Sequence, residues 1–222
     1  TGNLLMASQP LADRIRPQSL DQFIGQSHLV GPGKPLNLAI QQNRVYSMIF
    51  WGPPGVGKTT LARIIAKQTN RPYFELSAVS AGKSQIREIV DQIQAEGKRD
   101  LFNQGETQPK GSAVLFLDEI HRFNKAQQDF LLPYVEDGTL ILIGATTENP
   151  SFEVISALLS RSRVFVLEAL SVDEIKQILQ QGAAELGVTV EPAAEDFLAV
   201  LRSEPGHAGA RPRAGRIRPP RA

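Results

Sequence analysis

The feature that most constrains the fold of this 222-residue chain is a glycine-rich loop at residues 52–59, GPPGVGKT, which fits the pattern G-x-x-x-x-G-K-[ST]. The apolar run at 45–51 before it predicts a buried strand. Residues 59–68 after it predict a helix with apolar positions at helical spacing. Strand, loop and helix in this order indicate a P-loop nucleotide-binding fold, and an ordinary Gly/Pro turn before a helix is the alternative.

The chemistry of such a loop is phosphate binding. Glycines allow positive φ and close approach, so that backbone N–H groups and the positive end of the helix surround the anion. Lys58 is expected to reach the β- and γ-phosphates, and Thr59 is expected to place a hydroxyl on Mg²⁺. The predicted nucleotide contacts in this segment are Gly52, Pro53, Pro54, Gly55, Val56, Gly57, Lys58, Thr59 and Thr60. The expected ligands are therefore a nucleotide and Mg²⁺.

A second apolar run, residues 113–117, ends in the adjacent carboxylates Asp118 and Glu119. It reads as a central parallel strand that delivers both acids to its C-terminal edge, where ligands of α/β proteins bind. Successive strand residues point to opposite sides, so the two acids need not share a task. We expect Asp118 to hold the Mg²⁺ shell and Glu119 to orient the attacking water. The alternative is a strand that simply ends in solvated acids.

Elsewhere, strands and helices alternate without internal repeats, which predicts an α/β fold: a mostly parallel five-stranded sheet with helices on both faces. The remaining strands are expected at 71–76, 139–144 and 163–167. Helices are expected at 83–97 and, capped by Asn124, up to Leu132. Residues 101–111 read as a loop. Ser171 and Glu174 form a predicted capping box at the start of a smaller helical domain, whose next helix runs from about 191 to 201.

Composition agrees with a nucleotide-binding enzyme of the cytoplasm. The chain has no cysteine, so disulfides and thiolate metal sites are excluded, and no apolar run approaches the ~18 residues of a membrane span. The net charge of +1 conceals an asymmetry, because residues 202–222 carry six arginines against one acid. That tail lacks apolar periodicity and is expected to be disordered. Truncation or an altered reading frame explains it better than nucleic-acid binding does. Residues 1–8 are expected to be disordered or a remnant of cloning.

Five segments together resemble the AAA+ ATPases of the clamp-loader and Holliday-junction-motor branch, and most of all the replication-associated recombination protein A family, relatives of the Werner-helicase-interacting ATPase. They read PLADRIRP at 10–17, FIGQ at 23–26, WGPPG at 51–55, DEIHRFNK at 118–125 and GATTENPSF at 144–152. The resemblance covers about residues 9–201. It implies an ATPase core at 9–169 and a partial helical lid domain at 170–201.

The resemblance also assigns further site residues. An adenine and ribose pocket is implied at Arg14, Pro17, Ile24, Gly25 and Gln26, so the resemblance implies ATP as the nucleotide. Thr146 or Thr147 is implied as the sensor of the γ-phosphate. Ser-Arg-Ser at 160–162 is similar to a clamp-loader motif whose arginine enters the neighbouring subunit's ATP site, which would make Arg161 that finger; Arg163 and a plain surface arginine are the alternatives.

The family resemblance implies an ATP-dependent motor acting in replication-fork maintenance, recombination and repair. Its implied partners are DNA that is forked, single-stranded or carries ends, repair proteins such as single-strand-binding protein, and further copies of the chain. A clamp-loader subunit, a branch-migration motor and a nucleotide-switched scaffold without useful turnover are the competing functions. The family's lid arginine within Gly-Asp-Ala-Arg-Arg has no counterpart after Leu201.

Overall fold

The computed structural model describes residues 10–103 and 112–203, which fold into two compact units. One unit is Arg16–Ala169; the other combines the described residues before Arg16 with those from Leu170 onward. The predicted disordered segment 1–8, residues 204–222 of the predicted tail 202–222, and most of the predicted loop at 101–111 lie outside the described residues. Arg202 and Ser203 of that tail are helical, so disorder was wrongly predicted for these two residues. None of the described helices is long and apolar enough to cross a membrane.

The larger unit is built on a five-stranded sheet in the order β2-β3-β4-β1-β5, in which every neighbouring pair is parallel. The predicted α/β fold is therefore confirmed. The strands are β1 (Met48–Trp51), β2 (Tyr73–Ser77), β3 (Ala113–Asp118), β4 (Leu140–Thr146) and β5 (Arg163–Val166). Because all five run in the same direction, the polar residues that follow β1, β3 and β4 meet at one edge of the sheet.

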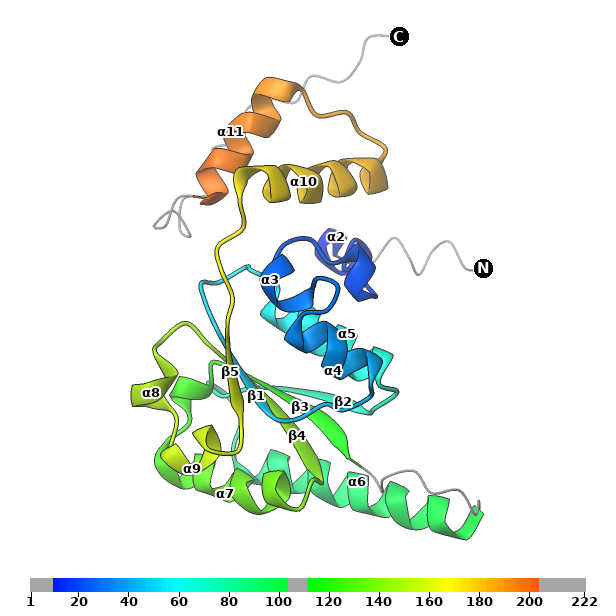
Figure 1. The fold of residues 1–222 in the computed structure, drawn as a ribbon, viewed down its shortest axis with the longest axis vertical. Helices are drawn as coiled ribbons and strands as arrows, with labels where there is room; N and C mark the ends of the chain where they lie inside the picture. Colours follow the sequence, from blue (N-terminus) through cyan, green and yellow to red (C-terminus); the bar gives the residue numbers. More distant parts are fainter. Residues whose placement is uncertain (1–9, 104–111, 204–222) are drawn as a thin grey trace. The chain divides into compact units, whose positions relative to one another are not determined.

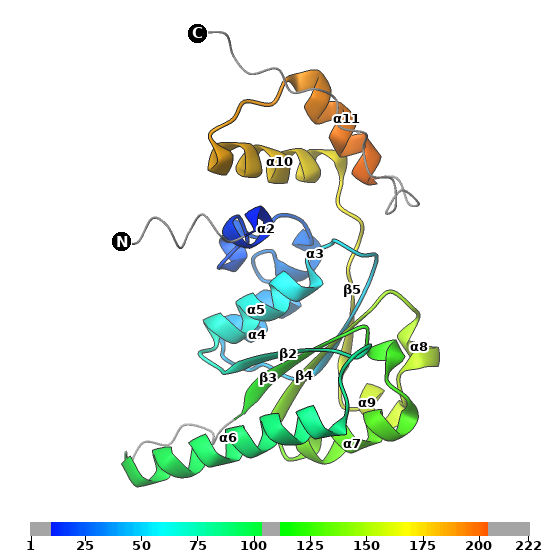
Figure 2. The same ribbon diagram turned by 180° about the vertical axis from the view of Figure 1, so that it is seen from behind.

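Helices cover both faces of this sheet (Figures 1 and 2). On one face pack α4 (Pro35–Gln41) and α5 (Lys58–Gln68), and on the other α6 (Lys83–Asn103) and α7 (Lys125–Glu136). The alternation along β3 shows why: Val114 and Phe116 enter the first core, whereas Leu115 and Leu117 enter the second. A strand buried on both faces must be apolar throughout, as this one is.

Shorter helices complete the larger unit. They are η1 (Leu20–Gln22), α3 (Ser27–Val30), η2 (Ile120–Arg122), α8 (Pro150–Glu153) and α9 (Ser156–Leu159). Gln128 of α7 ties three of these segments together, although its side chain is buried. Its Nε2 donates to the carbonyl oxygens of Phe123 and Glu153, and its Oε1 accepts from the Ile155 N–H, each at 2.9 Å. One glutamine thus satisfies three backbone groups that a sheet or helix would otherwise pair.

Two helices are longer than the sequence pattern predicts. The helix expected to end at Gly97 continues to Asn103, so residues 101–103 are helical and were wrongly assigned to a loop. The helix expected to end at Leu132 continues through Pro133 to Glu136. Its predicted N-cap is confirmed, since Asn124 and Gln127 bond each other's backbone N–H in a capping box.

The second unit contains α2 (Leu11–Arg14), α10 (Val172–Leu186) and α11 (Pro192–Ser203). The predicted capping box at Ser171 and Glu174 starts α10. Leu11 and Ile15 pack beside Gly182 of α10, where a Cβ would lie 3.7 Å and 3.8 Å from their side chains, at ordinary contact distance. Arg14 also donates to the Glu185 carboxylate, with Nη2 to Oε1 at 2.6 Å.

Candidate nucleotide site

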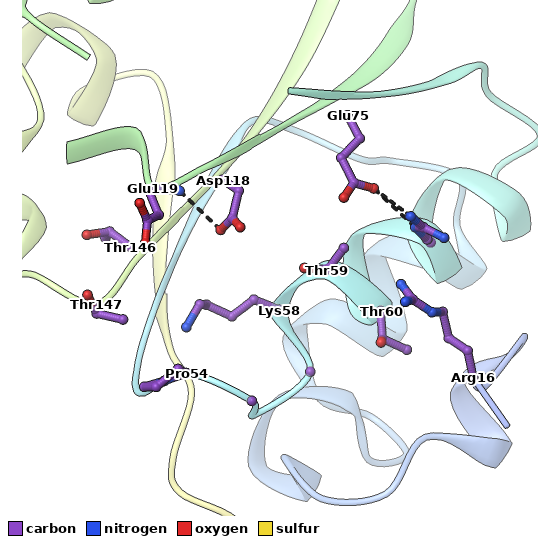
Figure 3. A pocket seen from close by; sticks show the side chains of 13 residues that line it. Arg16, Pro54, Lys58, Thr59, Thr60, Glu75, Asp118, Glu119, Thr146 and Thr147 are labelled. Carbon is purple, nitrogen blue, oxygen red and sulfur yellow. Dashed lines mark hydrogen bonds and ion pairs between the residues drawn. The ribbon is translucent and has the colours of Figure 1, made fainter. Parts of the chain in front are cut away.

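A cavity of about 470 Å³ lies at the C-terminal edge of β1, β3 and β4, within the size range of cofactor sites. Thirteen residues line it (Figure 3). Ten of them were predicted from the sequence: Pro54, Gly55, Gly57, Lys58, Thr59, Thr60, Asp118, Glu119, Thr146 and Thr147. The fold therefore brings the loop at 52–59, the paired acids and the threonines after β4 to one place.

The loop keeps its shape through glycines at positions that no other residue could occupy without strain. Gly55 and Gly57 have φ of 78° and 97°, and Gly57 is the N-cap of α5. A Cβ on Gly57 would lie 2.7 Å from Phe23 Cζ, and one on Gly52 would lie 2.2 Å from the Leu167 carbonyl oxygen. The backbone N–H groups at the start of α5 consequently face the cavity without side chains in the way, which suits an anion.

Lys58 extends along this loop. Its Nζ donates to the carbonyl oxygens of Gly52 and Pro53, each at 2.7 Å. Partial burial lowers the pKa of the Lys58 ammonium, and the nearby Asp118 carboxylate acts in the opposite direction. Gly52 and Pro53 do not line the cavity themselves. Their carbonyl oxygens accept the hydrogen bonds of the Lys58 ammonium.

Asp118 is the last residue of β3, and Glu119 follows it in a left-handed conformation with φ of 52°. The Glu119 N–H donates to Asp118 Oδ1 at 3.1 Å. A non-glycine residue held in this region costs about 1–3 kcal/mol and is typical of functional sites. The turn separates the two carboxylates while leaving both half-buried in the cavity wall.

The two predicted sensor threonines differ in their surroundings. Thr146 is the buried last residue of β4, 1% exposed, and its hydroxyl contacts His121 Nδ1 at 3.1 Å and the Glu148 N–H at 2.9 Å. Thr147, one residue further, is exposed and lines the same cavity. Of the two, Thr147 therefore presents the more accessible hydroxyl.

Three lining residues were missed by the sequence predictions: Arg16, Arg63 and Glu75. Arg63 donates to Glu75 Oε2 through Nη2 at 2.8 Å, and the Tyr73 hydroxyl donates to the same oxygen at 3.0 Å. This hydrogen bonding raises the pKa of Arg63, and burial, more than the adjacent Glu75 carboxylate, raises the pKa of the Tyr73 phenol. A signal existed for Arg63, because it follows Thr59 by four residues on α5 and so shares its face. Arg16 lies in the segment PLADRIRP at 10–17, one of the five that carry the family resemblance.

Other predicted residues lie outside the cavity lining. Val56 is buried in the core, and Pro17, Ile24 and Gly25 are half-buried nearby in the sequence but do not line it. Arg14 belongs to the second unit, paired with Glu185.

Gln26 is buried, and its side-chain amide bonds the backbone of Glu168, two residues after β5. Its Nε2 donates to the Glu168 carbonyl oxygen at 2.7 Å, and its Oε1 accepts from the Glu168 N–H at 2.9 Å. Both hydrogen-bonding ends of this side chain hold backbone, so the role that the structure gives Gln26 is to join two segments.

Arg161 follows α9 and also lies outside the cavity. Its side chain is 41% exposed, and its Nη2 lies 2.6 Å from Glu136 Oε1. Arg163, the competing candidate, is in β5 with its guanidinium carbon 4.6 Å from the centre of the Tyr46 ring. An aromatic face already holds Arg163, whereas Arg161 is held by an exposed ion pair.

The donor set fits a nucleotide phosphate with a hard divalent cation. It combines helix N-terminal N–H groups and the Lys58 ammonium with two oxygen donors suited to Mg²⁺, the Thr59 hydroxyl and the Asp118 carboxylate. No cluster of three or more His, Cys, Asp or Glu that could hold a metal occurs in the described ranges 10–103 and 112–203. A cation here would therefore take its remaining ligands from phosphate and water, as Mg²⁺ commonly does.

Comparison with known proteins identifies a family and several relatives. The sequence model of the ATPase family associated with various cellular activities (AAA) matches residues 48–172. Replication-associated recombination protein A of Haemophilus influenzae is 54% identical over 79% of this chain and 37% of its own length, and that of Escherichia coli is 53% identical over 78% and 36%. The chain thus spans little more than a third of these relatives.

More distant proteins share the fold. The ATPase WRNIP1 of Dictyostelium discoideum is 44% identical over 78% of this chain and 18% of its own length. Among solved structures, the RuvB Holliday junction branch migration motor of Thermotoga maritima is 33% identical, with a TM-score of 0.66 over 83% of this chain and 59% of that one.

Proposed function

This chain belongs to the AAA family of ATPases, and from that premise we propose that it binds ATP with Mg²⁺ and hydrolyses it as the nucleotide-driven part of a protein of replication-associated recombination and repair. The observation that carries the proposal is the shared cavity. Lys58 and Thr59 of the loop, Asp118 and Glu119 after β3, and Thr147 after β4 all line it. Binding groups and water-activating groups are thereby within one site.

Different residues bind different phosphates of the nucleotide. Backbone N–H groups from Gly55 to Thr60 surround the α- and β-phosphates, and Lys58 exchanges its carbonyl partners for β- and γ-phosphate oxygens. Thr59 and Asp118 would hold Mg²⁺, which would supply neutralisation of the phosphate charge. The adenine and ribose are assigned to the neighbouring segment around Pro17, Ile24 and Gly25, as the family resemblance implies, and Arg16 at the cavity wall extends that assignment.

Hydrolysis depends on Glu119. Its carboxylate accepts a proton from the attacking water and orients that water in line with the bond to the leaving phosphate. Glu119 directly follows the proposed Mg²⁺ ligand Asp118 and has a left-handed backbone, with φ of 52°. Thr147, which lines the same cavity, contacts the γ-phosphate. In this assignment the two adjacent acids perform different tasks, one on the cation and one on the water.

We further propose that Arg161 completes the site of a neighbouring copy of the chain. It lies outside its own cavity, and a guanidinium near the γ-phosphate stabilises the charge that develops during transfer. An arginine supplied in trans requires an oligomer. DNA as the substrate is a proposal that rests on the names of the relatives, which are proteins of replication-associated recombination. Single-strand-binding protein as a partner and a cytoplasmic location near DNA are proposals that rest on the family resemblance alone.

The test is ATP hydrolysis at steady state, with and without single-stranded and forked DNA. Nucleotide binding is measured separately by calorimetry. Lys58→Ala should lose binding, whereas Glu119→Gln should keep binding and lose turnover by about a hundredfold or more, the usual scale of general-base catalysis. Turnover unchanged in Glu119→Gln would contradict the assignment and favour a nucleotide-switched scaffold. Stimulation by DNA would support the proposed substrate, and its absence would count against it.

A further inference from the structure

The hydroxyl of Thr146 makes more contacts than its place at the cavity wall requires. Its Oγ1 accepts from the Glu148 N–H at 2.9 Å, donates to the Glu148 carbonyl oxygen at 3.2 Å and contacts His121 Nδ1 at 3.1 Å. A hydroxyl has one hydrogen and two lone pairs, so these three partners saturate it when Nδ1 carries the imidazole proton. The hydroxyl therefore has no capacity left for a phosphate, although Thr146 was one of two predicted sensors.

His121 belongs to η2, the turn that positions Glu119. Glu119 is the N-cap of η2, and its carbonyl oxygen accepts from the Arg122 N–H at 2.8 Å. The same turn is docked on β4 by apolar contact, because a Cβ on Gly144 would lie 2.9 Å from Ile120 Cδ1. The turn thus rests on β4 at two points: an apolar one at Gly144 and a polar one, two residues later, at Thr146.

This contact links two of the segments that line the cavity. Glu119 and Thr147 line it from different segments. His121 follows Glu119 by two residues, and Thr146 directly precedes Thr147, so the His121–Thr146 contact joins the segment of one to the segment of the other. A shift of η2 along β4 would change the separation of the water-activating carboxylate and the exposed threonine.

We propose that His121, through its hydrogen bond to Thr146, is a positioning residue that fixes Glu119 and Thr147 relative to each other around the γ-phosphate. The inference rests on the proposed ATPase function. His121 touches neither nucleotide nor water in this scheme; it acts through Thr146. The competing explanation is that the imidazole only satisfies a buried hydroxyl, in which case its loss would lower stability without changing how the site treats the γ-phosphate.

The two explanations differ in a quantity that needs no turnover. This is the ratio of the dissociation constants for ADP and for a non-hydrolysable ATP analogue, which differ in the γ-phosphate. We expect His121→Ala and Thr146→Val to lower this preference for the analogue about threefold to tenfold, the scale of one net hydrogen bond, with ADP affinity unchanged. His121→Asn, whose amide nitrogen can occupy the position of Nδ1, should retain most of the preference.

A matched control exists in Thr69, another buried threonine, whose hydroxyl donates to the Ile65 carbonyl oxygen at 2.7 Å and which does not line the cavity. Thr69→Val removes the same hydroxyl and should leave the preference unchanged. Thermal unfolding of every variant shows whether it is folded. The double variant His121→Ala/Thr146→Val should be no worse than Thr146→Val alone, since Thr146→Val already breaks the His121–Thr146 contact along with the two bonds to Glu148.

The outcomes separate the two proposals. An unchanged preference in His121→Ala and Thr146→Val overturns the positioning role, and so does a wild-type chain that binds ADP and the analogue equally. A wild-type chain that binds neither overturns the proposed ATPase function itself. Loss of preference in the alanine and valine variants, recovery in His121→Asn and no change in Thr69→Val would establish the role. Turnover, where measured, should fall through kcat rather than KM.

Discussion

Arg161 and Glu136 form an ion pair in which Nη2 and Oε1 are 2.6 Å apart, with side chains 41% and 48% exposed. The same guanidinium donates through Nη1 to the carbonyl oxygen of Ala157 at 2.9 Å. Exposed pairs of this kind contribute about 0–1 kcal/mol, because water screens them and ordering two long side chains costs entropy. Arg161 can therefore leave Glu136 for another partner at little cost.

The first prediction concerns that exchange. Arg161→Ala should leave the melting temperature nearly unchanged but reduce ATP turnover, and mixing it with Lys58→Ala should restore part of the turnover. The Lys58→Ala chain supplies the arginine and the Arg161→Ala chain supplies the intact cavity. Turnover is measured across mixing ratios at fixed total protein. Failure of every mixture to exceed the sum of its parts would exclude a role in trans.

Glu119 should show a conflict between stability and activity. Glu119→Gly relieves the left-handed strain and should raise the free energy of unfolding by about 1 kcal/mol while abolishing hydrolysis. Glu119→Gln, which keeps the backbone preference, should abolish hydrolysis without that gain. Urea denaturation of both variants measures the difference. Equal stability of the two would show that the conformation is not strained in the folded protein.

Asp118 should control the requirement for Mg²⁺. Asp118→Asn keeps an oxygen and accepts the Glu119 N–H, but it loses the negative charge that attracts the cation. The Mg²⁺ concentration for half-maximal turnover should rise by about tenfold or more, because carboxylate oxygens are the preferred protein ligands of this ion. Titration of turnover with Mg²⁺ at saturating ATP measures the change. Glu75→Gln, in the same cavity but bonded to Arg63, is the matched control and should shift the midpoint little.

Gly144 should be intolerant of a side chain. Gly144→Ala places a methyl group 2.8 Å from Ile49 Cδ1 and 2.9 Å from Ile120 Cδ1, so it should lower the free energy of unfolding by about 1–3 kcal/mol. Adding Ile120→Val removes one of the two clashing methyl groups and should recover part of the loss. Denaturant unfolding of the single and double variants tests this. Strictly additive losses would mean that η2 does not pack on Gly144 as described.

Gln128 should be among the polar side chains most important for stability. Gln128→Met has similar shape but leaves the carbonyl oxygens of Phe123 and Glu153 and the Ile155 N–H without their partner. Each buried group left unsatisfied costs about 1–3 kcal/mol, so the melting temperature of Gln128→Met should lie well below that of the wild type. Gln41→Met on the exposed end of α4 is the control and should change little. A wild-type melting temperature in Gln128→Met would contradict this account.

Local spacing predicted the centre of the site, because its parts are close in sequence. Lys58 and Thr59 directly follow the loop after β1, and Asp118 and Glu119 lie at the end of β3. One buried strand before each group therefore fixes its position at the C-terminal edge of the sheet. The pairing of Thr146 with His121 could not be predicted in this way. It depends on β3 lying beside β4, and the order β2-β3-β4-β1-β5 is a property of the assembled sheet.

The same reasoning explains what was missed. Arg63 and Glu75 meet only because β2 packs beneath α5, and no local pattern states that. The predicted helix ends were wrong where the helix continues through a residue that disfavours helical structure. Gly97 costs only about 1 kcal/mol inside a helix, and Pro133 lacks one N–H in a helix that continues to Glu136. The residue type at those positions determines the end of a helix less strongly than tertiary packing does.

The double hydrogen bond from Gln26 to the backbone of Glu168 also has a practical consequence. It joins the beginning of the larger unit to its end, since these residues lie near the two ends of Arg16–Ala169. A module whose first and last segments are already tied together is suited to transplantation. The larger unit could be inserted into a surface loop of another protein without moving its termini apart. Its ends could also be joined by a short linker and new termini opened elsewhere.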